Sequence, residues 1–372
     1  MGDILQLDMP FRQRSRAARQ VALIDRVASA RRGSEDVFWL KENAELLNVL
    51  ESTKAAPGTG ALAAYEGFYR DIEARIGFFP QYYRFFLSIC LDLEDLGLGG
   101  DSGDDKAVAL AEWVASQGLV GAELSDLQRA EARRLCLRRG VDPLAGDHGL
   151  DDRLRAFARR SATFALPNKK AAYELTHIIF YLSEYGRRDP GADAAMIESL
   201  CHTGTLAFLE LNIDLLSEVC IALRFAGATP PPVWERWLAD QANRFQVLPA
   251  DRPGGMDDYH PWLMLNWFMA LSGRGGFAHE MPQGAVVFAA PEPNAGPLRE
   301  LSDCMYKLRD ARSPDWDKMR DRVGDGLSDE ARNVLAAAEE AVDFSVFFRG
   351  FARAGGPGLR PGAATVARGR PS

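Results

Sequence analysis

Five glycines at nearly regular intervals constrain the fold of this chain more than any other feature. They are Gly97, Gly140, Gly186, Gly227 and Gly273, and they are separated by 43, 46, 41 and 46 residues. A stretch of helical character precedes each glycine, and in four cases of five it is strongly apolar. Glycine often closes a helix because it adopts the left-handed conformation at little cost. A period of about 40–47 residues is typical of stacked helix pairs.

The pattern of helix, short loop and helix recurs five to seven times, and few segments have the alternation of a strand. The sequence therefore predicts an all-α protein of repeated helix pairs, arranged as an (α/α) toroid or a tight α-solenoid. The second helix of most pairs is apolar almost all round, which favours closure because such a helix is buried on both sides. The expected helices are 15–32, 34–50, 61–76, 80–96, 106–117, 125–139, 151–163, 168–185, 192–209, 213–225, 231–245, 257–271, 298–309 and 328–348.

One helical-repeat domain is expected over residues 15–350, with flexible basic tails at 1–14 and 351–372. Ser34 is expected to cap the second helix. Residues 277–297 resist a helical assignment because they are rich in Gly and Pro, although QGAVVFAA within them is a candidate short strand. An irregular stretch of this length in a helical body is often a lid or a binding loop.

Composition favours a cytoplasmic bacterial protein. The chain has 372 residues, of which 47% are hydrophobic and 26% charged, as in ordinary soluble globular proteins. No apolar run is long enough to cross a membrane, and the N-terminal segment lacks the apolar core of a secretory signal. Arginine greatly outnumbers lysine, which is typical of a GC-rich bacterial genome. The five cysteines form no C-x-x-C pair, so we expect free thiols in a reducing compartment.

The charge distribution bears on the partners. The net charge is −8, and because both ends of the chain are basic, the middle is more acidic than this figure. Binding along a nucleic-acid backbone needs a basic surface, so we expect no nucleic-acid partner and no membrane partner. A small molecule or a peptide is the expected ligand, and a protein partner remains an alternative.

The glycines also give reference positions from which equivalent residues on successive helices can be counted. Nine and thirteen residues before a glycine differ by four, which is one helical turn on the same face. At these two distances from the last three glycines, three apolar helices carry polar or ionisable side chains. These side chains are Tyr173, His177, Asp214, Glu218 and His260. Charged residues are rarely buried without a partner or a purpose.

The functional interpretation is a polar centre with catalytic groups. His177 and His260 would act as acid or base, since imidazole titrates near neutral pH, and Asp214 and Glu218 would orient them or bind a metal. Two histidines and two carboxylates suit a divalent metal, although no specific motif identifies a cofactor. Side chains beside these four are the expected substrate contacts, namely Tyr173, Thr176, Tyr259, Trp262 and Asn266.

A structural interpretation stands beside it. Asp214 or Asn212 would cap its helix, Glu218 would pair with Arg224 or with an arginine elsewhere, and the histidines would be satisfied core residues. Two functions therefore remain open. One is an enzyme acting on a small organic or peptide substrate at a central site, and the other is a helical-repeat scaffold that binds a protein partner without catalysis.

Two other metal patterns are incomplete. Cys201-His202 resembles part of the zinc-binding Cys-His-Gly element of lanthionine cyclase-like proteins, which are also (α/α) toroids, but the next residue is Thr203. Glu174 and His177 form one E-x-x-H pair, whereas di-iron bundles need two.

The stretches DVFWLKENAELLNVLE, FFPQYYRFFLSICLDLEDLG and AAYELTHIIFYLSEYGRR resemble an uncharacterised helical family of marine and photosynthetic alphaproteobacteria, described only as a domain of unknown function. The resemblance covers roughly residues 34–348. It implies no activity, and it marks as positions to test Thr176, His177, Asp214, Glu218, Tyr259 and His260.

Overall fold

The computed structural model describes residues 15–57, 60–99, 106–252, 256–292 and 296–354. Residues 1–14 and 355–372, where basic tails are predicted, lie outside these ranges. The described part of the chain is almost entirely helical, which confirms the all-α prediction. None of its helices is long and apolar enough to cross a lipid bilayer.

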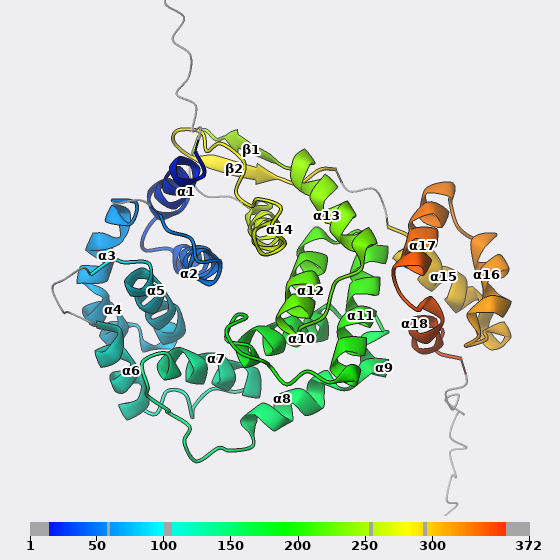
Figure 1. The fold of residues 1–372 in the computed structure, drawn as a ribbon, viewed down its shortest axis with the longest axis horizontal. Helices are drawn as coiled ribbons and strands as arrows, with labels where there is room; N and C mark the ends of the chain where they lie inside the picture. Colours follow the sequence, from blue (N-terminus) through cyan, green and yellow to red (C-terminus); the bar gives the residue numbers. More distant parts are fainter. Residues whose placement is uncertain (1–14, 58–59, 100–105, 253–255, 293–295, 355–372) are drawn as a thin grey trace, which may run out of the picture.

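Six helices, here called the inner helices, stand around the centre of the described structure, and all but α7 (Asp126–Leu137) are mainly apolar (Figure 1). Each contacts the next one in chain order, and the last contacts the first, so the contacts return to their starting helix. Tight packing is favourable here because these helices bury side chains on most of their circumference. The inner helices are α2 (Val37–Ser52), α5 (Tyr83–Asp95), α7 (Asp126–Leu137), α10 (Lys169–Leu182), α12 (Ile213–Phe225) and α14 (Tyr259–Leu271).

Other helices pack against the inner six along the chain, as α6 does on α5 and α11 on α12. They are α1 (Arg16–Asp25), which continues as a π-helix over Arg26–Ala30, α3 (Glu66–Arg70), α4 (Ile72–Phe78), α6 (Lys106–Ser116), α8 (Leu150–Ala158), α9 (Ser161–Phe164), α11 (Ala194–Leu209) and α13 (Pro232–Arg244). The prediction of one helix over 61–76 is wrong, since the structure has two short helices there.

The inner helices share a common ending, which explains the glycine series. In all six a residue with positive φ follows the helix, and the next N–H donates to the carbonyl five residues back, as Leu98 does to Leu93. In α2 the positive-φ position is occupied by Lys54, at a φ of 53°, so this helix lacks a glycine marker. In α10 this position is occupied by Glu184, at a φ of 48°, the bond runs from Tyr185 to Phe180, and Gly186 lies two residues after Glu184.

The helix starts also follow capping rules, with one correction. Asp36 caps α2 by accepting a hydrogen bond from the N–H of Phe38, so the prediction that Ser34 caps this helix is wrong. Asn212 caps α12 by accepting from the N–H of Leu215. The side chain of Asp214 is therefore not needed as a cap.

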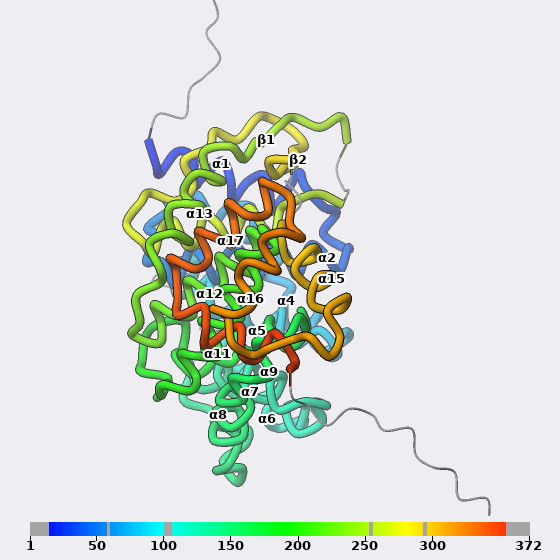
Figure 2. Tube along the Cα trace, turned by 90° about the vertical axis from the view of Figure 1, so that its right-hand side faces the viewer, coloured from blue at the N-terminus to red at the C-terminus, as the bar shows by residue number. Residues whose placement is uncertain are grey.

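The last four helices form a separate group on one flank of the molecule (Figures 1 and 2). They are α15 (Leu298–Leu308), α16 (Trp316–Gly324), α17 (Asp329–Ala341) and α18 (Phe344–Phe351). The group contacts α11 and α13 through α17. The prediction of one helix over 328–348 is wrong because Val342 is extended between α17 and α18. Phe351, where the C-terminal tail was expected to start, is fully buried at the end of α18.

A short hairpin-like pairing covers one end of α14. Strand β2 (Val286–Ala289), which the sequence predicts, pairs antiparallel with β1 (Gln246–Pro249), which it does not. Phe288 of β2 and Phe277 before it are buried against Trp262 of α14. The described part of the irregular segment at 277–297 is therefore anchored by core packing.

Candidate functional site

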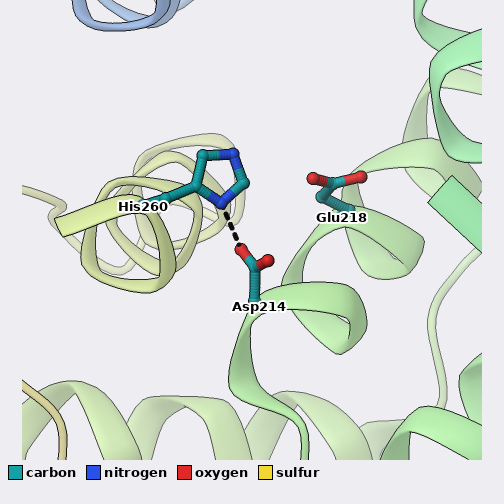
Figure 3. Close-up of side chains that lie close together, drawn as sticks. All are labelled: Asp214, Glu218 and His260. Carbon is teal, nitrogen blue, oxygen red and sulfur yellow. Dashed lines mark ion pairs between the residues drawn. The ribbon is translucent and has the colours of Figure 1, made fainter. Parts of the chain in front are cut away.

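A cavity of about 130 Å³ lies between the six inner helices, and both ionisable and apolar side chains line it. His177, Glu218 and His260 line it directly. Asp214 lies beside them, in contact with His260 (Figure 3). The structure thus brings together the four side chains that the sequence singles out as candidate catalytic groups.

Asp214 and His260 form the shortest link in this group. Nδ1 of His260 lies 2.8 Å from Oδ1 of Asp214 (Figure 3). The hydroxyl of Tyr173 donates to Oδ2 of Asp214 at 2.7 Å. Burial alone would lower the pKa of His260, but the contact with Asp214 and the charges of Glu45 and Glu218 raise it to about 9. The imidazole of His260 is therefore a cation at neutral pH.

Glu218 is enclosed by the protein, with 1% of its side chain exposed. The hydroxyl of Thr176 donates to Oε2 of Glu218 at 2.5 Å. Burial raises the pKa of Glu218, and the neighbouring Asp214 raises it further, against the opposing effect of His177. The expected ion pair with Arg224 does not form, because Arg224 pairs with Glu235.

His177 has one ring nitrogen fixed and the other directed to the cavity. Its Nδ1 lies 2.7 Å from the carbonyl oxygen of Tyr173, and a carbonyl can only accept, so Nδ1 carries a hydrogen. In the neutral ring Nε2 is then the unprotonated nitrogen. The side chain is 37% exposed and lines the cavity, so a small molecule can reach this nitrogen.

Helix α2 contributes two further charged groups that the sequence analysis missed. Oε1 of Glu45 lies 3.8 Å from Nε2 of His260 and 3.7 Å from the ammonium of Lys41. Both side chains line the cavity. Burial raises the pKa of Glu45, although the positive charges of His260 and Lys41 oppose this change.

The residue counting used on the sequence would have found these groups if it had been applied to all six inner helices. Counting nine residues back from Lys54 and from each of the five glycines reaches six side chains that all line the cavity. They are Glu45, Ser88, Glu131, His177, Glu218 and Met264. Counting thirteen back from Lys54 and Gly97 reaches Lys41 and Arg84, which line it as well.

The predicted substrate contacts divide into two groups. Tyr173 and Thr176 hold Asp214 and Glu218 through their hydroxyls. Tyr259, Trp262 and Asn266 do not line the cavity, since they belong to the opposite face of α14. Tyr259 donates to the carbonyl of Glu42, Trp262 packs on Phe277 and Phe288, and Asn266 bonds the backbone of Trp262 and Phe277.

The incomplete zinc pattern lies outside the cavity. Cys201 and His202 are on α11, and Nδ1 of His202 contacts the carbonyl oxygen of Ser161 at 3.0 Å. The ring of His202 packs against Phe347 of α18. In contrast, Asp214, Glu218 and His260 each place one ligand atom within 4.8 Å of the others.

Comparison with known proteins assigns the family but no activity. A family model described as a domain of unknown function, DUF6902, matches residues 1–354. The chain belongs to this family. No curated protein and no solved structure matches the chain. Membership of DUF6902 confirms the resemblance to a domain of unknown function, so the function has to be argued from the site itself.

Proposed function

We propose that this member of DUF6902 is an enzyme that acts on a small organic or peptide substrate in the central cavity. The observation that carries the proposal is the convergence of His177, Asp214, Glu218 and His260 at the polar cavity, from three helices and across 83 residues of sequence. Titratable groups with strongly shifted pKa values in one concave site are typical of catalytic centres.

The proposed architecture is an (α/α) toroid of repeated helix pairs. Its support is the closed series of contacts from α2 to α14 and back to α2. A second support is that counting nine residues back from Lys54 and from each of the five glycines reaches a cavity-lining residue on every inner helix. A repeat in the sequence then produces a ring in which each helix presents one side chain to the same space.

The geometry suggests a division of roles within acid–base catalysis. His177 offers the lone pair of Nε2 to the cavity, so we assign it as the general base. His260 is cationic and is held by Asp214, so we assign it as the proton donor or as the group that stabilises negative charge. Tyr173 and Thr176 are positioning residues, because they act through Asp214 and Glu218.

Turnover by a His177 variant tests this function. The purified protein is incubated with small carboxylic acids, amides, esters and dipeptides, and products are followed by proton NMR. We expect at least one compound to be converted, and His177→Gln to slow that conversion by about 10²–10⁴-fold with little change in melting temperature. His148→Gln, at an exposed histidine, is the control. Conversion at the same rate in both variants, or none by the wild type, would contradict the proposal.

A divalent cation at Asp214, Glu218 and His260 is a second candidate, favoured by the closeness of their ligand atoms. Ligands about 2.0–2.3 Å from one ion lie roughly 3–4.5 Å apart, so a small inward movement would suffice. A metal would have to displace the proton from His260, so its affinity would rise as the pH rises toward about 9.

Calorimetric titration with Zn²⁺ and Mn²⁺ tests the metal. We expect one ion per chain, lost in Glu218→Gln and retained in Asp152→Asn, where the carboxylate is exposed. Equal binding by both variants would place the ion elsewhere.

The scaffold alternative has weaker support. A protein-binding repeat would present a continuous apolar surface. The most exposed large apolar side chains, Phe78, Leu124, Met256 and Tyr306, come from four separate segments. A polar interior cavity favours a small ligand over a protein partner.

A further inference from the structure

Three side chains at the cavity hold buried hydrogen-bond donors without a partner among the described residues. They are Arg134 with Nε and Nη1, Asn48 with Nδ2, and Trp267 with Nε1. All three line the cavity and are 5%, 6% and 2% exposed. Buried donors without a partner are uncommon because each loses its hydrogen bonds to water and gains none in return. All of these atoms are donors, so the missing partner is an acceptor.

These donors lie further along their helices than His260 and Lys41 do. Trp267 is seven residues after His260 on α14, and Asn48 is seven residues after Lys41 on α2. Seven residues of helix correspond to about 10 Å along the axis. The cavity therefore has an acid–base level around His260 and a donor level around Arg134, Asn48 and Trp267.

Arg134 has weaker ion pairs than Arg84, the other arginine that lines the cavity. Arg84 is paired with Glu131 and, at 3.1 Å, with Glu123. Among the described residues, Arg134 has one ion pair, a 3.9 Å contact from Nη1 to Glu184 that is too long for a hydrogen bond. Its guanidinium lies 4.3 Å over the ring of Tyr185, which stacks on Trp267. The side chain of Tyr185 also hydrogen-bonds Arg134, whereas Nε and Nη1 of Arg134 have no partner among the described residues.

We infer that the donor level binds the carboxylate group of a small organic acid, with Arg134 as the principal partner and Asn48 and Trp267 as additional donors. The inference rests on the proposed function in taking the cavity as the substrate site, and it specifies the substrate class. The planar guanidinium matches the two oxygens of a carboxylate, and the amide and indole N–H groups add single bonds.

The size and the remaining lining of the cavity agree with this ligand. A volume of about 130 Å³ is close to that of a 150 Å³ cavity that holds benzene, so the acid has few non-hydrogen atoms beyond its carboxylate. Ala44, Phe180 and Met264 supply apolar surface for its carbon chain. With the carboxylate at Arg134, the rest of the molecule extends toward His177 and Glu218.

Calorimetric titration with propionate and propionamide tests the inference, since the two probes share a shape and differ in charge. We expect the wild-type chain to bind propionate at least tenfold more tightly than propionamide. Arg134→Gln should weaken propionate at least tenfold and propionamide much less, because the amide oxygen accepts a hydrogen bond but carries no charge to pair with the guanidinium. Arg133→Gln, one residue along α7 and outside the cavity lining, is the control of equal charge.

Two further variants keep the test valid if Arg134→Gln fails to fold. Trp267→Phe and Asn48→Leu keep the bulk of the side chain and remove one donor each, so each should weaken propionate about two- to tenfold. Equal binding of propionate by wild type and variants, or tighter binding of inorganic phosphate than of propionate, would overturn the carboxylate subsite.

The same titration with His177→Gln separates this inference from the proposed function. In this variant propionate should still bind at least tenfold more tightly than propionamide, because Arg134 remains in place. If Arg134→Gln binds propionate as tightly as the wild type while His177→Gln loses turnover, the carboxylate subsite is wrong and the catalytic centre stands. If Arg134→Gln loses propionate binding while His177→Gln keeps its turnover, the assigned catalytic centre is wrong and the subsite stands.

Discussion

On one side of the cavity, α10, α12 and α14 bring their polar side chains into direct contact, whereas α2, α5 and α7 on the other side leave several polar atoms facing the space. On the first side Asp214 is shared by His260 and Tyr173, and Glu218 is held by Thr176. On the second side Arg134 and Asn48 have donors with no partner among the described residues, and on the first side Nε1 of Trp267 joins them. The contrast suggests that the first side is organised before a ligand arrives, and that the second is completed by the ligand.

The largest effect on stability is expected from removing Asp214, on the side of the cavity formed by α10, α12 and α14. Asp214→Ala should lower the free energy of unfolding by about 2–3 kcal/mol at pH 7, because it leaves the cationic His260 without its partner. Urea denaturation measures this change. Asp152→Ala, at a carboxylate that is 82% exposed, should change stability by less than about 0.5 kcal/mol. If Asp214→Ala also lowered the free energy of unfolding by less than about 0.5 kcal/mol, the two sides of the cavity would not differ.

The pH dependence of His260 should be next in size. Its pKa in the folded protein, about 9, is higher than the ordinary 6.5, so folding favours the protonated ring. The resulting stability is complete below pH 6.5 and is lost as the pH rises through 9, by about 2–3 kcal/mol. The difference in unfolding free energy between wild type and His260→Gln should therefore shrink between pH 6 and 9.5. A constant difference would show that the ring is neutral.

A smaller effect should follow from removing the hydroxyl that supports Glu218. Thr176→Val should cost about 1–2 kcal/mol at pH 8 and less at pH 5. The reason is that the hydroxyl stabilises the ionised carboxylate, so its loss raises the pKa of Glu218 further and the cost appears as the pH rises. Thr205→Val removes a hydroxyl that bonds only the carbonyl of Cys201, so its cost should not depend on pH.

The smallest effect on stability is expected on the side of the cavity formed by α2, α5 and α7. Arg134→Met should change the unfolding free energy by less than about 1 kcal/mol in either direction, since no hydrogen-bonded carboxylate loses its partner. Arg138→Met, one turn further on α7, should be clearly destabilising because it leaves the buried Asp92 uncompensated. Similar losses in the two variants would mean that Arg134 is a structural residue.

The sequence was sufficient to predict the organised side of the site. His177, Asp214, Glu218 and His260 are ionisable groups in apolar helices with glycine markers, so their shared depth followed from counting. The other side was missed because α2 ends at Lys54 and carries no such marker. Aromatic contacts were harder still, since Tyr259 and His260 are adjacent in sequence but about 100° apart around the helix.

Elements that depend on distant partners were also beyond the sequence. Strand β1 exists through its pairing with β2, about forty residues away, and alone it has no strand pattern. The break at Val342 and the helix α16 belong to the C-terminal group, where short helices are defined by packing on Trp316, Phe344 and Phe348. Local propensity describes such contacts poorly.

The equal depth of one residue on each inner helix has an evolutionary consequence. A single codon change at that level replaces one chemical group facing the common space and leaves the backbone, the helix ends and the neighbouring positions as they were. Ser88 and Met264 already occupy two of the six positions with side chains that do not titrate near neutral pH. Members of this family that differ only at such positions would inherit the same scaffold with different reactivity, so comparing these six sites is the most direct way to sort the family by chemistry.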